Sequence, residues 1–89
     1  MSVRRHVVVR GAVQGVAFRD NTRRAAGSRG VAGWVTNRSD GAVEAVFEGD
    51  SEAVEAMVEF CREGPRAADV EDIDVSEEEP EGLSGFEVR

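Results

Sequence analysis

The chain has 89 residues and a net charge of −7, from 18 acidic and 11 basic residues. This length suits one domain over residues 1–89, and the acidic surplus argues against a general nucleic-acid-binding protein, which would carry a basic face. No apolar run approaches the roughly 20 residues that span a bilayer, and no signal-type segment follows the first residues. We therefore expect a cytoplasmic protein with no nucleic-acid or membrane partner.

The first half of the chain predicts strands on either side of a helix. Residues 3–10 alternate around three β-branched valines, which favours a strand, and Gly11 and Gly15 then interrupt the pattern. Residues 19–29 predict a helix, because Asp20 suits the positive end of the helix dipole and Gly30 can end the helix. Its packing face is predicted to contain Thr22, Ala25, Ala26 and Arg29.

The second half predicts a hairpin, a helix and two more strands. Asp40-Gly41 between residues 31–37 and 42–48 is a strong hairpin signal, since glycine tolerates positive φ. Residues 51–63 predict a helix capped by Asp50 or Ser51, with an apolar stripe of Val54, Met57, Val58 and Cys61. The remaining expectations are a fourth strand at 70–75, a solvated acidic loop at 77–82 and a short fifth strand at 86–89.

This order of elements predicts an α+β fold. Strand, helix, two strands, helix and strand is the split βαβ, or ferredoxin-like, arrangement. We expect an antiparallel sheet of four to five strands with both helices on one face. Because that fold supports many activities, the function has to be argued from a site.

The segment between the first strand and the first helix has the properties of a phosphate-binding loop. Free N–H groups at a helix start bind anions, and glycines let successive N–H groups turn inward. Arg19 adds a planar fork that matches two phosphate oxygens. The predicted phosphate-binding residues are Gln14, Gly15, Val16, Ala17, Phe18 and Arg19. From these residues alone, an ordinary glycine-containing turn with Arg19 on the surface stays open as an alternative.

Asn37 is the second candidate site residue, where a predicted strand meets its hairpin. Its amide can accept a hydrogen bond from a water molecule and donate one to a phosphate oxygen, and so can orient a nucleophile. The alternative is that Asn37 only forms the turn, because asparagine is common in turns.

Together these two segments resemble the acylphosphatase family. The chain contains Gly-Ala-Val-Gln-Gly-Val-Ala-Phe-Arg at 11–19 and Gly-Trp-Val-Thr-Asn-Arg-Ser-Asp-Gly-Ala-Val-Glu at 33–44. Gly64-Pro65 and Phe86-Glu87-Val88-Arg89 also resemble the family, so the similarity covers essentially the whole chain. The resemblance implies a ferredoxin-like fold and the hydrolysis of small acyl phosphates to carboxylate and phosphate.

The resemblance also implies roles for two residues. Arg19 would bind the phosphoryl group and Asn37 would position the attacking water, with no cofactor, no metal and no covalent intermediate. This suits the chemistry, because an acyl phosphate has a good leaving group and a loose transition state that needs positioning and charge stabilisation. Asp20 departs from the aromatic or apolar residues that are common in this stretch of the family, and its carboxylate could weaken substrate binding. We expect no direct pair between Arg19 and Asp20, since adjacent helix residues do not face each other.

Other readings have weaker support in the sequence. Cys61 and Arg66 lie one residue too close for a cysteine-phosphatase loop, and Cys61 falls on an apolar helix stripe. His6, the only histidine, is expected on the surface of a strand. Two further alternatives are a phosphate-binding regulatory module without turnover and a relative of the acylphosphatase-like domain of hydrogenase-maturation carbamoyltransferases. We expect a stand-alone monomer.

The basic residues are all arginines, and lysine is absent. An acidic surplus without lysine is typical of proteins from salt-loving organisms, in which high net charge keeps proteins soluble. A GC-rich genome, which favours arginine codons, is the alternative explanation.

Overall fold

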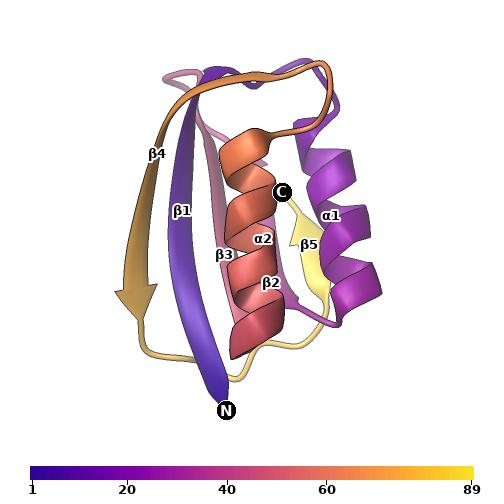
Figure 1. The fold of residues 1–89 in the computed structure, drawn as a ribbon, viewed down its shortest axis with the longest axis vertical. Helices are drawn as coiled ribbons and strands as arrows, with labels where there is room; N and C mark the ends of the chain where they lie inside the picture. The colour runs from indigo at the N-terminus through magenta and orange to yellow at the C-terminus, as the bar shows by residue number, and fades with distance from the viewer.

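The fold is a five-stranded sheet with two helices on one face, in a computed structural model that describes all 89 residues (Figure 1). The strands are β1 (Ser2–Ala12), β2 (Ala32–Asn37), β3 (Val43–Asp50), β4 (Asp69–Glu78) and β5 (Phe86–Val88). The helices are α1 (Phe18–Arg29) and α2 (Ser51–Glu63), so the predicted order of elements is confirmed. The four long strands give the ferredoxin-like sheet in the order β4-β1-β3-β2, and β5 is added beside β2.

The sheet is mixed, whereas the sequence predicted an antiparallel one. β1 pairs antiparallel with β3 and β4, and β2 pairs antiparallel with β3, but β5 runs parallel to β2. The chain crosses from β4, at one edge of the sheet, to β5 at the other (Figure 1). This crossing gives β5 the same direction as β2 and brings the C-terminal residues beside α1.

The core lies between the helices and the sheet. The predicted stripe of α2 (Val54, Met57, Val58 and Cys61) is fully buried, which confirms that pattern. On α1 the buried residues are Phe18, Thr22 and Ala26, while Arg29 is exposed, so the predicted face was wrong at that position. Thr22 can be buried because its hydroxyl donates to the carbonyl of Phe18 at 2.7 Å.

Two strands are longer than their sequence patterns indicated. β1 continues through Gly11, where the register with β4 shifts and φ is 131°. A Cβ at Gly11 would lie 2.2 Å from the carbonyl oxygen of Asp69, so only glycine fits there. β4 extends to Glu78, so the predicted acidic loop at 77–82 is partly strand. Its acidic end is held by cross-strand ion pairs with Arg4 and Arg5.

The predicted hairpin between β2 and β3 is confirmed. Gly41 has a φ of 92°, and the side chain of Asp40 accepts a hydrogen bond from the backbone N–H of Ala42 at 3.1 Å. Arg38 closes the turn through its own backbone and an ion pair to Asp40 at 3.1 Å. This turn fixes Asn37 at the end of β2, opposite Val43.

No helix is long and apolar enough to cross a membrane. No group of three or more His, Cys, Asp or Glu side chains is arranged to hold a metal ion.

Candidate active site

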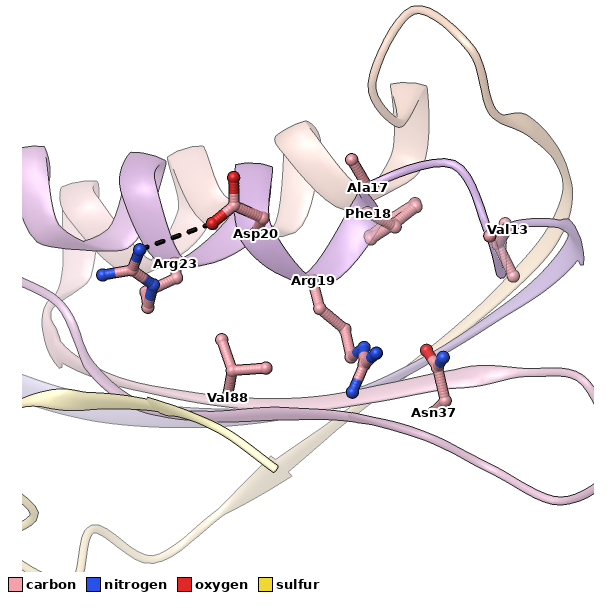
Figure 2. A pocket seen from close by; sticks show the side chains of 9 residues that line it. Val13, Ala17, Phe18, Arg19, Asp20, Arg23, Asn37 and Val88 are labelled. Atoms are coloured by element: carbon pink, nitrogen blue, oxygen red, sulfur yellow. Dashed lines mark hydrogen bonds and ion pairs between the residues drawn. The ribbon is translucent and has the colours of Figure 1, made fainter.

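A cavity of about 340 Å³ lies where the start of α1 faces the end of β2 and the last strand, β5 (Figure 2). Its lining residues come from three separate segments of the chain, the stretch from the loop into α1, the end of β2 and β5: Val13, Gly15, Ala17, Phe18, Arg19, Asp20, Arg23, Asn37 and Val88. The size is at the lower end of the range for small-molecule sites. The cavity therefore suits a small organic ligand.

The turn before α1 has an unusual backbone. Gly15 has a φ of 75°, and Ala17 has a φ of 61°, the only positive φ of a non-glycine residue in the chain. A left-handed conformation costs a residue with a Cβ roughly 1–2 kcal/mol, and such strain is often found at functional sites. The strain at Ala17, directly before α1, therefore indicates that the conformation of this turn serves a function, at some cost in folding stability.

The same turn leaves backbone donors free. The first α-helical hydrogen bond runs from the N–H of Asn21 to the carbonyl of Ala17 at 3.0 Å, so the preceding N–H groups have no acceptor within the helix. No backbone N–H of residues 14–17 donates to another backbone group. Free donors at the positive end of a helix form a binding site for an anion.

Arg19 extends from α1 toward Asn37, and both side chains line the cavity (Figure 2). One guanidinium nitrogen of Arg19 donates to the backbone oxygen of Arg89 at 3.0 Å, and this oxygen also accepts from the hydroxyl of Thr36 at 3.2 Å. Arg19 forms no ion pair with an acidic side chain. A guanidinium has five N–H donors, so most of them remain available to a ligand.

The side chain of Asn37 makes no hydrogen bond within the protein, although its position is fixed by the hairpin. Both polar groups of its amide can therefore serve a ligand or a water molecule. Thus the structure brings together Arg19 and Asn37, which the sequence singled out separately.

The predicted phosphate-binding residues divide into two groups. Gly15, Ala17, Phe18 and Arg19 line the cavity, whereas Gln14 and Val16 do not. Gln14 donates to the carbonyls of Arg38 and Ala42 at 2.8 and 2.9 Å, so its side chain attaches the loop to the hairpin that carries Asn37. Val16 packs against the core.

Asp20, the acidic residue that follows Arg19, forms ion pairs with other arginines. Asp20 forms ion pairs with Arg23 at 3.3 Å and Arg24 at 3.2 Å, one turn along α1. The expectation that Arg19 and Asp20 do not pair is therefore confirmed. Asp20 lines the cavity, but its charge is offset by two guanidinium groups.

Sequence reasoning did not identify Val13, Arg23 and Val88 as site residues. Arg23 follows Arg19 by four residues, a spacing that puts both on one helix face and could have indicated it. Val88 lies in a predicted strand, but its place in the cavity could not be predicted, because it arises from the parallel pairing of β5 with β2.

The loop before β5 is held by a buried carboxylate. Glu48 has only 3% of its surface exposed, and it accepts hydrogen bonds from the N–H groups of Glu81, Gly82 and Leu83 at 2.8–3.0 Å. It also accepts one from Arg4 at 2.9 Å. Burial alone would raise the pKa of Glu48, but these hydrogen bonds outweigh it and lower the pKa to about 2. The charged carboxylate thus anchors the segment that leads to Val88.

Two other reactive side chains lie outside the cavity. Cys61 is fully buried on α2, and burial raises the pKa of its thiol to about 12. It is therefore protonated and inaccessible, unlike a nucleophilic cysteine. His6 is half-buried on β1, where its Nε2 lies 2.6 Å from a carboxylate oxygen of Glu44.

Comparisons with known proteins agree on one family. The acylphosphatase family model matches residues 5–88. An acylphosphatase from Haloarcula marismortui is 59% identical over 97% of this chain and 94% of its own length. One from Gloeobacter violaceus is also 59% identical, over 98% of this chain and 94% of its own length.

A crystal structure agrees with this result. The acylphosphatase from Bacillus subtilis superposes with a TM-score of 0.93 at 39% identity and covers 98% of each chain. The sequence and structural matches thus extend over nearly the whole of both proteins. The chain therefore belongs to the acylphosphatase family, whose enzymes hydrolyse acyl phosphates.

Proposed function

We propose that this chain hydrolyses acyl phosphates by direct attack of a positioned water on phosphorus. The observation that carries the proposal is the meeting of Arg19 and Asn37 in one cavity beneath the free N–H groups of the loop (Figure 2). The loop and the guanidinium offer fixed positive potential to a phosphoryl group, and the unbonded amide of Asn37 offers a contact for water.

In this mechanism the phosphoryl group binds between the turn at residues 15–18 and Arg19. The charge on its equatorial oxygens grows as the bond to the leaving carboxylate lengthens, and donors already in place stabilise this charge without reorganising. Asn37 accepts a hydrogen bond from water and holds it in line with the leaving group. The carboxylate leaves without a general acid, because it is stable as an anion at neutral pH.

The site of water attack can be tested directly. Hydrolysis of benzoyl phosphate in ¹⁸O-labelled water, with EDTA present, should place the label in inorganic phosphate. Label in benzoate would show attack at the carbonyl carbon and overturn the proposal. Loss of activity with EDTA and its recovery on adding a divalent cation would contradict the proposed metal-free mechanism.

The finer properties that accompany this activity are also proposals. A net charge of −7 on 89 residues produces mutual repulsion, which supports a monomer. Its action on small acyl phosphates in the cytoplasm is part of the same proposal. The same charge and the absence of lysine support adaptation to high salt. Sedimentation velocity at several salt concentrations tests the monomer, and a dimer at micromolar concentration would contradict it.

A further inference from the structure

The cavity contains a second guanidinium that the proposed hydrolysis does not use. Arg23 lines it together with Arg19 and lies four residues further along α1. Side chains at this spacing are neighbours on one helix face, with Cβ atoms about 5–6 Å apart. Figure 2 shows Arg19 extending from α1 toward the sheet, whereas the guanidinium of Arg23 is turned toward Asp20. Arg23 is thus placed next to the phosphoryl position, at a distance of about one helical turn.

The partner of Arg23 holds it only weakly. Asp20 lies 3.3 Å from Arg23, and both side chains are about half exposed, at 48% and 52%. Ion pairs of this kind contribute little, in the range of about 0–1 kcal/mol. Asp20 also has Arg24 as a second partner at 3.2 Å, so it does not lose its only counter-ion when Arg23 turns toward a ligand. Arg23 is therefore available to an anion that enters the cavity.

The wall near the two arginines can accept the carbon body of a substrate. Val88 and Phe18 line the same cavity, and Figure 2 shows Val88 facing α1 from β5. A cavity of about 340 Å³ also holds more than a phosphoryl group. Its lining thus combines a phosphoryl position at Arg19, an apolar surface and a second positive group at Arg23.

We propose that Arg23 is a specificity-determining residue that favours acyl phosphates whose acyl group carries a second negative charge. The acyl group lies against Val88, and its anionic end replaces Asp20 as the partner of Arg23. Asp20 is then an internal competitor that lowers the affinity for this end. The inference rests on the proposed function, because it assumes that the phosphoryl group binds at Arg19.

A matched pair of substrates isolates the contact. The carboxylate of 4-carboxybenzoyl phosphate is negatively charged, whereas 4-methylbenzoyl phosphate has a neutral group at the same ring position, and neither can cyclise. The measured quantity is the ratio of kcat/KM for the carboxylate substrate to kcat/KM for the methyl substrate. Since both substrates have the same phosphoryl group, effects at Arg19 cancel in this ratio.

Arg23→Gln should lower the ratio roughly threefold to tenfold, the range for a half-exposed charge-assisted contact. Arg29→Gln is the matched control, because it removes the same charge from an exposed position of α1 outside the cavity. The control should change the ratio by less than about twofold. Asp20→Asn should raise the ratio, and this gain should disappear in the double variant with Arg23→Gln.

The proposed function and the specificity of Arg23 can fail separately. If the wild type hydrolyses both substrates but Arg23→Gln changes the ratio no more than Arg29→Gln does, the specificity inference is wrong and the proposed function stands. A gain from Asp20→Asn that persists without Arg23 also overturns the inference. If the wild type hydrolyses neither substrate, both the proposed function and the inference fail.

Discussion

Replacing Glu48 by glutamine should destabilise the protein at neutral pH and remove part of its acid sensitivity. The carboxylate has four donors, from Arg4 and the backbone of residues 81–83, and it is almost fully buried. A glutamine has one oxygen in place of two and presents its NH₂ group to some of these donors. Donors left unpaired in a buried site cost about 1–3 kcal/mol each.

The size of the effect follows from the pKa of Glu48. A pKa lowered from 4.5 to about 2 on folding corresponds to about 3 kcal/mol of stability, at about 1.36 kcal/mol per pH unit. Above pH 4.5 the carboxylate is charged in both states, so this stabilisation is fully present. As the pH falls from 4.5 toward 2, the unfolded chain takes up the proton first and the stabilisation is lost.

The assay is urea unfolding of the wild type and the Glu48→Gln variant between pH 7 and pH 2.5. Other carboxylates titrate in both proteins, so the difference in unfolding free energy isolates Glu48. We expect a difference of about 3 kcal/mol at pH 7 that shrinks steadily below pH 4.5. Glu79→Gln, at an exposed position without an ion pair, should differ from the wild type by less than about 0.5 kcal/mol. A difference that stays constant across the pH range would refute the argument from ionisation.

Three further predictions concern the site, the sheet and the charge. Arg19→Gln should abolish measurable substrate binding, while Asn37→Ala should lower kcat on the order of 10²-fold with binding largely kept; near-normal kcat in the second variant would disprove its role. Gly33→Ala should lower the unfolding free energy by more than about 3 kcal/mol in urea melts, because its Cβ would lie 1.8 Å from the carbonyl oxygen of Val46; a smaller loss would show that β2 can shift. The melting temperature and kcat/KM should both rise from millimolar to molar potassium chloride, as the Debye length falls from about 30 Å to about 3 Å. A flat or falling melting temperature would leave codon usage to explain the missing lysines.

Sequence patterns were most informative where neighbouring residues determine the structure. The second helix spans Ser51–Glu63, the predicted range, and Asp50 is at its N-cap, but the expected capping hydrogen bond from a side chain is not formed. Asp40-Gly41 correctly located the hairpin, because a tight turn needs a positive φ at a particular residue. Each of these features depends on interactions within a few residues, so they can be read without knowing the rest of the fold.

Features that depend on distant partners were not predictable. Glu48 alternates with the core residues of β3, which by itself indicates an exposed side chain, and its burial comes from a loop 33–35 residues away. The length of β4 depends on its backbone pairing with β1, which continues to Arg4 and Arg5 near the start of the chain. Similarly, the role of Gln14 in holding the hairpin depends on carbonyl groups 24 and 28 residues away.

The ion pairs of the arginines leave Arg19, in the active site, without an acidic side chain as a partner. Eight arginines form ion pairs with carboxylates, and the three that do not are Arg19, Arg29 and Arg66. Only Arg19 of these three lines the cavity, and its single hydrogen bond is to a backbone oxygen. The chain has 18 acidic residues, any of which could form an ion pair with Arg19 if it lay close enough. The nearest one in sequence, Asp20, instead forms ion pairs with Arg23 and Arg24. A phosphoryl group then meets guanidinium donors that no acidic side chain engages, and donors already in place are what preorganised electrostatic catalysis requires.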